Sequence, residues 1–138
     1  MKDSQAAPVI EARGLNLVFQ TADGPVQALK DVNLVVNRGE FVSFIGPSGC
    51  GKTTFLRAVA ALEVRTSGSL TVNGMTPDEA RRKRAYGYVF QAAGLYPWRT
   101  IAGNIRLPLE IMGFSKAEME SRISPVLELV EQIGRAHV

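Results

Sequence analysis

The sequence predicts an α/β protein built around one strand–loop–helix unit, and three observations lead to this fold class. Short apolar runs rich in β-branched residues occupy the N-terminal part of the chain, and helical periodicity occupies the C-terminal part. Between them, a glycine-rich loop separates an apolar run from an amphipathic segment. The 138 residues are sufficient for one domain with a hydrophobic core.

Five segments predict β-strands, because apolar and β-branched residues run between turn residues: 9–20, 26–40, 41–46, 67–74 and 86–91. The first two are joined by the turn sequence TADGP, and the second ends at an Asn-Arg-Gly turn. The run FVSFIG of residues 41–46 is almost uniformly apolar, which is typical of a strand buried on both faces of a parallel sheet. We interpret YGYVFQ, residues 86–91, in the same way.

Helices are predicted for four segments: 52–62, 77–84, 100–112 and 115–130. In the first, apolar residues recur at helical spacing. The second starts with proline and acidic residues and ends with basic residues, as the helix dipole favours, and we interpret its basic run as a solvated face. Ser115 and Glu118 form a capping box that predicts the start of the last helix.

Composition limits the classes of function. Hydrophobic residues make up 46% and charged residues 21% of the chain, as in soluble globular proteins. The net charge of +3 is too small to indicate nucleic-acid binding, and no nucleic-acid partner is expected. The one cysteine, Cys50, excludes an internal disulfide and suits a reducing compartment. No apolar run reaches the ~18 residues of a membrane span, and no signal peptide is found, so we expect a cytoplasmic protein.

The glycine-rich loop fits a phosphate-binding pattern. Gly46, Gly51, Lys52 and Thr53 match G-x-x-x-x-G-K-[ST], with an apolar run before the loop and a helical segment after it. Residues without side chains let the backbone amides converge on a polyphosphate, and the following helix directs its positive end at the same anion. Lys52 would add a charge for the outer phosphates, and the Thr53 hydroxyl would ligate Mg²⁺. The alternative is a glycine-rich turn without a ligand.

The stretch GPSGCGKTT resembles the Walker A loop of ATP-binding cassette (ABC) ATPases. The flanking sequences LKDVNLVVNRGEFVSFIG and LEVRTSGSLTVNG also resemble that family, and the similarity extends over residues 9–130. It implies a P-loop NTPase core with an N-terminal antiparallel β-subdomain and the start of an α-helical subdomain, truncated, with ATP and Mg²⁺ as cofactors. The nucleotide-binding residues implied in the loop are Gly46, Pro47, Ser48, Gly49, Cys50, Gly51, Lys52, Thr53 and Thr54.

Two further residues take roles from this resemblance. Phe19 falls where the family places an aromatic side chain that stacks on adenine, although an ordinary strand residue facing the core is the alternative. Gln91 ends VFQ, which resembles the family's Q-loop, and the resemblance implies that its amide ligates Mg²⁺ and positions the attacking water. The resemblance thus implies Lys52 and Gln91 as catalytic residues. The alternative for Gln91 is an ordinary polar residue at the end of a strand.

The segment AAGLYPWRTIAGNIRLPLEIMGFSKAEM resembles importer ATPases for nitrate, sulfonates and taurine. The resemblance implies that the helical subdomain docks on a transmembrane permease subunit, with Tyr96, Pro97 and Trp98 near the contact. Trp98 packed under its own loop is the alternative. The partners implied are permease subunits and a second ATPase subunit, and the location is peripheral, on the inner face of the cell membrane.

Several motifs of the family are missing from these residues. None of the aspartates follows an apolar strand as a Walker B motif requires, no LSGGQ signature occurs, and the single histidine is His137. We therefore expect the N-terminal half of a cassette, residues 1–131, which would not hydrolyse ATP alone. Residues 132–138 can be written as the translation of a common sequencing adapter, and we expect them to be a non-native tail.

The function expected from the sequence is that of the ATP-binding subunit of an ABC importer, which couples ATP binding and hydrolysis to solute uptake. Two alternatives stay open at this point. One is an ABC-type ATPase that acts on DNA or ribosomes, and the other is a nucleotide-binding module that does not hydrolyse ATP.

Overall fold

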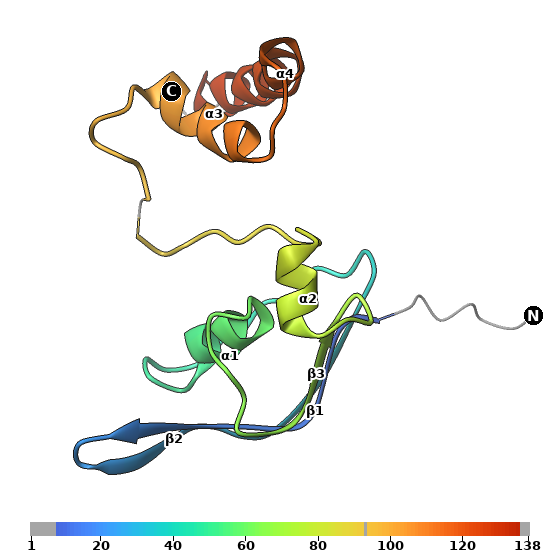
Figure 1. Ribbon diagram of the computed structural model, residues 1–138, viewed down its shortest axis with the longest axis vertical. Helices are drawn as coiled ribbons and strands as arrows, with labels where there is room; N and C mark the ends of the chain where they lie inside the picture. The colour runs from blue at the N-terminus through green and yellow to red at the C-terminus, as the bar shows by residue number, and fades with distance from the viewer. Residues whose placement is uncertain (1–7, 93, 136–138) are drawn as a thin grey trace, which may run out of the picture. The chain divides into compact units, whose positions relative to one another are not determined.

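The computed structural model describes residues 8–92 and 94–135. The chain divides into two compact units, Met1–Val89 and Phe90–Val138, which are described separately below. Figure 1 shows both units, with the strands and the first two helices in the N-terminal unit and the last two helices in the C-terminal unit.

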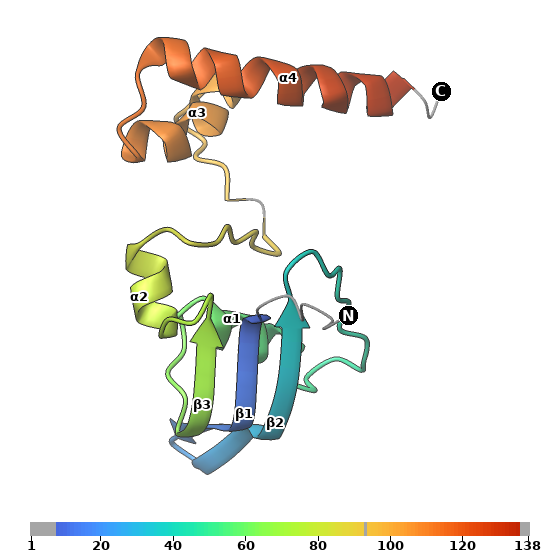
Figure 2. The same ribbon diagram turned by 90° about the vertical axis from the view of Figure 1, so that its right-hand side faces the viewer.

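The first unit is built on a three-stranded antiparallel sheet. Its strands are β1 (Pro8–Thr21), β2 (Gly24–Asn37) and β3 (Ser67–Val72), and their order in the sheet is β2-β1-β3. Figure 2 shows β1 between the other two strands. The strands predicted for residues 9–20, 26–40 and 67–74 are thus confirmed, and so is the antiparallel pairing implied for this part of the chain.

Helix α1 (Lys52–Val59) packs against one face of this sheet (Figures 1 and 2). Leu15 and Leu17 of β1 have relative exposures of 0% and 1%, and Phe55 of α1 is buried with them. Side chains of a strand alternate between its two faces, and the register shift between Ala12 and Leu15 moves the buried positions of β1 from even to odd residue numbers. The other buried members of the core are Ala12, Leu29, Ala58, Val59, Leu70, Val72 and Ala80.

Helix α2 (Pro77–Arg82) starts with a capping box. The backbone amide of Thr76 donates to the Glu79 carboxylate at 2.9 Å, and the Glu79 amide donates to the Thr76 hydroxyl at 3.3 Å. The bonds from the Thr76 amide and hydroxyl hold the pKa of the Glu79 carboxyl below its usual value. Two amides at the start of the helix are satisfied in this way.

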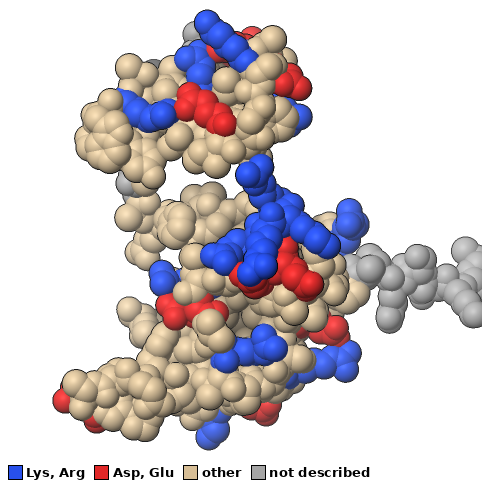
Figure 3. All heavy atoms as spheres, in the orientation of Figure 1, with Lys and Arg blue, Asp and Glu red and all other residues tan. Residues whose placement is uncertain are grey.

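The basic run that includes the end of α2 is exposed. The Asp78 carboxylate pairs with Arg81 at 2.7 Å and with Arg82 at 2.8 Å, and Lys83 and Arg84 follow on the surface. Figure 3 shows blue side chains gathered with red ones over α2. The mixture of signs agrees with the prediction of a solvated face.

Two predicted strands are wrong. Residues 41–46 and 86–91 lie outside any strand, and within the described residues no strand pairs with them. Phe41, Ile45 and Val89 are each 95% exposed. A strand of a parallel sheet needs a neighbouring strand supplied by a crossover connection, whereas the antiparallel strands of the first unit pair with one another.

Helix α1 is shorter than predicted. It ends at Val59 rather than near Leu62, because the chain turns at Ala61, whose φ is 52°. The carbonyl of Ala60, at the end of this helix, accepts a hydrogen bond of 2.7 Å from the Tyr86 hydroxyl. Burial raises the pKa of the Tyr86 hydroxyl above its ordinary value of 10.0.

The second unit contains α3 (Ile101–Ile111) and α4 (Lys116–Arg135), so both helices predicted there are confirmed. The Thr100 hydroxyl caps the start of α3. The predicted capping box of α4 is also present, since the Ser115 amide donates to the Glu118 carboxylate at 2.8 Å and the Glu118 amide donates to the Ser115 hydroxyl at 3.4 Å. The hydroxyl and amide of Ser115 hold the pKa of the Glu118 carboxyl below its usual value.

Helix α4 continues past the domain boundary expected at Glu131 and reaches Arg135, while residues 136–138 lie outside the described residues. The assignment of residues 132–138 to a non-native tail stays a prediction. Among the helices of the described ranges, none is both long and apolar enough to cross a bilayer.

Candidate functional site

The glycine-rich loop runs along the surface into the start of α1. Residues 46–50 are exposed, and Gly51 is the residue at which the helix begins. Gly51 has a φ of 95°, and a Cβ atom there would lie 2.7 Å from the Ala28 carbonyl oxygen and 3.0 Å from a Leu29 methyl group. Both the backbone angle and the close approach of β2 therefore require glycine at this position.

The Lys52 ammonium lies within this loop. It donates to the carbonyl oxygens of Gly46 at 2.7 Å and Pro47 at 2.6 Å, and it lies 3.3 Å from the Cys50 sulfur. These contacts close the loop around one positive charge and hold that charge beside the first turn of α1. An anion entering the loop would meet this charge together with the backbone amides.

The start of α1 differs from the starts of α2 and α3. Thr76 and Thr100 cap those two helices with their hydroxyl groups, whereas Gly51 provides no side-chain cap to α1. No acidic residue lies in the first turn of α1 either. The first amides of an α-helix have no partner within the helix, so those of α1 remain available to a bound anion.

The predicted metal ligand Thr53 lies in this first turn and is exposed. Across the described ranges, no group of three or more His, Cys, Asp or Glu side chains is placed to hold a metal ion. A single hydroxyl fits Mg²⁺ only as part of a shell completed by phosphate oxygens and water, which is the way Mg²⁺ usually binds with nucleotides. The residues present therefore suit a metal that arrives with the nucleotide.

A cavity of about 220 Å³ lies beside the loop. It is lined by Cys50, Gly51 and Lys52, by Phe44 and Phe55, and by residues of β2. The rings of Phe44 and Phe55 meet edge to face, with centroids 5.4 Å apart. The contribution of β2 was not predicted from the sequence. The β2 residues that line the cavity are Leu29, Val32, Asn33 and Leu34.

The other two predicted site residues lie outside this cavity lining. Phe19 pairs with Val26 in the β1–β2 hairpin, is half-buried and packs against the core. Gln91 belongs to the second unit, where it is exposed in a bend. Adenine stacking by Phe19 and Mg²⁺ ligation by Gln91 stay predictions.

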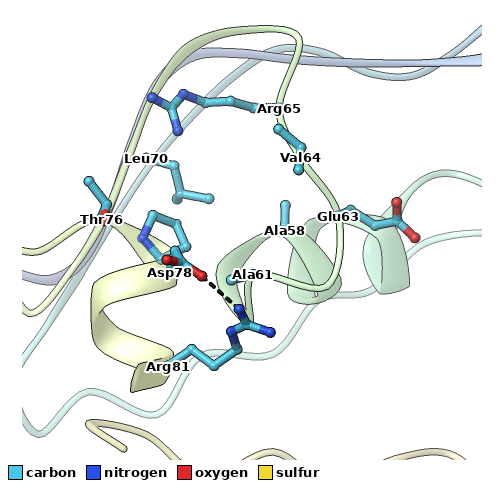
Figure 4. Close-up of a pocket in the computed structure, with 10 residues that line it drawn as sticks. Ala58, Ala61, Glu63, Val64, Arg65, Leu70, Thr76, Asp78 and Arg81 are labelled. Atoms are coloured by element: carbon cyan, nitrogen blue, oxygen red, sulfur yellow. Dashed lines mark hydrogen bonds and ion pairs between the residues drawn. The ribbon is translucent and has the colours of Figure 1, made fainter. Parts of the chain in front are cut away.

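A second hollow, of about 330 Å³, lies at the opposite end of α1 and is shown in Figure 4. Ala58 and Ala61 line it, and so do Asp78 and Arg81, whose side chains form an ion pair. None of the residues predicted to bind nucleotide lines it.

These features define an α/β protein of the P-loop class. It has an antiparallel sheet, a glycine-rich loop whose carbonyl groups bind a lysine, and a helix that begins without a side-chain cap. Residues 29–138 match the family model described as "ABC transporter". The chain therefore belongs to the ABC transporter family.

Curated proteins that are similar to this chain are named as import ATP-binding proteins. The chain is 43% identical over 109 residues to the maltose/maltodextrin import ATP-binding protein MalK of Mannheimia succiniciproducens, a match that covers 78% of this chain and 29% of the relative. It is 46% identical over 105 residues to the Fe(3+) ions import ATP-binding protein FbpC 2 of Rhizobium meliloti, covering 74% of this chain and 26% of that protein. The chain thus spans less than a third of the length of these relatives.

Solved structures give the same fold. The dimeric structure of MJ0796, a bacterial ABC transporter cassette, aligns with a TM-score of 0.75 and 32% identity over 88% of this chain and 57% of that one. A post-hydrolysis state of the same cassette bound to ADP and Pi aligns with a TM-score of 0.76. The predicted fold class is confirmed.

Proposed function

We propose that this chain provides the ATP-binding loop of an importer's ATPase subunit. The observation that carries the proposal is the Lys52 ammonium, which is hydrogen-bonded to two carbonyl groups of the loop at the uncapped start of α1. The family match and the relatives named as import ATP-binding proteins support the same function.

In this proposal the loop residues Gly46–Thr54 surround the phosphates, with Lys52 at the outer ones and the Thr53 hydroxyl on Mg²⁺. Phe19 stacks on adenine, and Gln91 ligates Mg²⁺ and positions the attacking water. The residues of this chain would thus bind and orient the triphosphate. Mg²⁺ bound with the nucleotide would neutralise charge on the phosphates.

The proposed partners are transmembrane permease subunits and a second ATPase subunit, and the proposed location is peripheral, on the inner face of the cell membrane. The dimeric structure of the similar cassette supports the second ATPase subunit. The segment of residues 92–119 supports an importer for nitrate, sulfonates or taurine. A gene for a membrane subunit of that class beside this one would test the solute class.

We also propose that the 138 residues bind nucleotide without hydrolysing it. Hydrolysis needs a carboxylate aligned with the attacking water and a donor for the charge that develops on the γ-phosphate. Neither the Walker B nor the signature sequence occurs in the chain. Phosphate release that depends on Lys52 in the purified chain would contradict this part of the proposal.

Titration of a fluorescent ATP analogue tests the central claim. Lys52→Ala removes the charge within the loop and should weaken Mg·ATP binding by roughly 2–4 kcal/mol, as expected for a charge-assisted contact. Lys83→Ala is the matched control, because Lys83 is an exposed lysine at the end of α2 and lies outside the loop. Equal affinity in the Lys52 variant and the wild-type chain would refute the proposed site.

A further inference from the structure

One side chain of the second unit bonds to the loop of residues 96–100 several times. The Asn104 carbonyl oxygen accepts from the Tyr96 amide at 2.7 Å. The Asn104 amide nitrogen donates to the carbonyl oxygens of Tyr96, Arg99 and Thr100 at 3.1, 3.3 and 3.1 Å. Asparagine suits this position because its side chain is both an acceptor and a donor.

The loop that Asn104 holds presents an aromatic pair. The ring centroids of Tyr96 and Trp98 lie 4.9 Å apart, with Pro97 between them in the chain. Trp98 is 76% exposed and Tyr96 is 42% exposed, so the alternative that Trp98 packs under its own loop is wrong within this unit. An ordered pair of aromatic rings on the surface is the kind of feature that dominates binding at protein interfaces.

The positive charge of Arg99, next to this aromatic pair, is neutralised by an ion pair within the same unit. The Arg99 guanidinium binds the Glu110 carboxylate at 2.8 Å and donates to the Gly103 carbonyl at 3.2 Å. Leu95 and Ile101, on either side of the loop, are exposed apolar residues. The surface offered by the loop is therefore apolar and aromatic, and it suits an apolar face rather than an acidic or phosphorylated partner.

We propose that Asn104 is a positioning residue that orders Tyr96 and Trp98 as an aromatic anchor for an apolar helix face of the membrane subunit. The inference rests on the importer function proposed above. A free loop would lose backbone and side-chain freedom on docking, whereas a loop tied by one amide has lost that freedom beforehand. Asn104 thus acts on the partner through the aromatic pair, without contacting the partner itself.

The first test follows the loop in the uncomplexed protein. Trp98 is the only tryptophan of the chain, so its fluorescence anisotropy decay reports the loop alone. Asn104→Ala should add nanosecond motion of Trp98 and reduce the near-ultraviolet circular dichroism of the aromatic pair. Asn104→Asp keeps the acceptor but loses the donors, and it should give an intermediate change. Ser115→Ala, which removes the cap of α4 in the same unit, should leave both signals unchanged.

The second test measures affinity for the membrane subunit in the assembled importer. Asn104→Ala and Trp98→Ala should each weaken subunit association about tenfold or more, with Mg·ATP affinity unchanged. The double variant should be no weaker than Trp98→Ala alone, because both changes remove the same anchor. Fully additive losses, or an unaltered anisotropy decay in Asn104→Ala, would overturn the inference.

The outcomes separate this inference from the proposed function. If Trp98→Ala retains full affinity for the membrane subunit, the anchor is wrong while the importer function stands. If the wild-type chain binds Mg·ATP but no membrane subunit, the importer function and this inference both fall, and the nucleotide-binding site remains.

Discussion

The three-stranded sheet and the segment of residues 41–46 both have apolar sequences, but only the sheet forms strands and buries its side chains. In the sheet, Leu15 and Leu17 are buried, and each strand pairs with another strand of the same unit. In the segment, Phe41 and Ile45 are 95% exposed and no strand forms. The difference shows that an apolar run becomes a strand only where a partner strand completes its hydrogen bonds, and the ranges that the structure describes contain such partners for the sheet alone.

The largest effect is expected from breaking the core of the sheet. Leu15→Ala deletes a fully buried side chain and should lower the free energy of unfolding by about 2–5 kcal/mol. Ile45→Ala is the matched control from the other region, and it should change that free energy by less than about 0.5 kcal/mol. Thermal unfolding in dilute solution would compare the two variants. A comparable loss in Ile45→Ala would mean that residues 41–46 are part of a packed core in solution.

A smaller effect is expected at Gly51, where the loop meets the sheet. Gly51→Ala adds a Cβ atom 2.7 Å from the Ala28 carbonyl oxygen at a φ of 95°, and it should destabilise the unit by about 2–3 kcal/mol. Gly49→Ala is the control, since Gly49 has a φ of 78° but no atom within 4 Å of the added carbon. That variant should lose only about 1–2 kcal/mol, from backbone strain alone. Equal losses in the two variants, measured by chemical denaturation, would show that contact with β2 is unimportant.

The sheet, the loop and the helix starts could be predicted from the sequence because their causes are local. The β-forming residues of 9–20 between turn residues predict a strand, and the spacing of Ser115 and Glu118 predicts a helix start. Residues 41–46 were mistaken for a strand because an apolar run does not reveal whether a partner is present. The four bonds of Asn104 were not predicted either, since they join backbone groups whose positions depend on the turn at Pro97.

The smallest effect on stability is expected from a change of pH. It should act on the first turns of α2 and α4 and leave the sheet unchanged. The carboxyl groups of Glu79 and Glu118 have lowered pKa values because amides and hydroxyls of Thr76 and Ser115 donate to them. A lowered pKa in the folded state means that the carboxylate stabilises the fold above its ordinary pKa of about 4.5. That contribution is then lost as the pH falls through the lower folded value.

Acid should therefore fray the first turns of α2 and α4 while the sheet persists, because the core of the described residues contains no buried charged side chain. Far-ultraviolet circular dichroism and amide hydrogen exchange between pH 6 and pH 3 would follow the two regions separately. Glu118→Gln keeps a side-chain acceptor but removes the titrating group, so the start of α4 should lose its pH dependence in that variant while α2 keeps its own. Loss of exchange protection in β1 at the same pH as in α4 would show that the two regions unfold together.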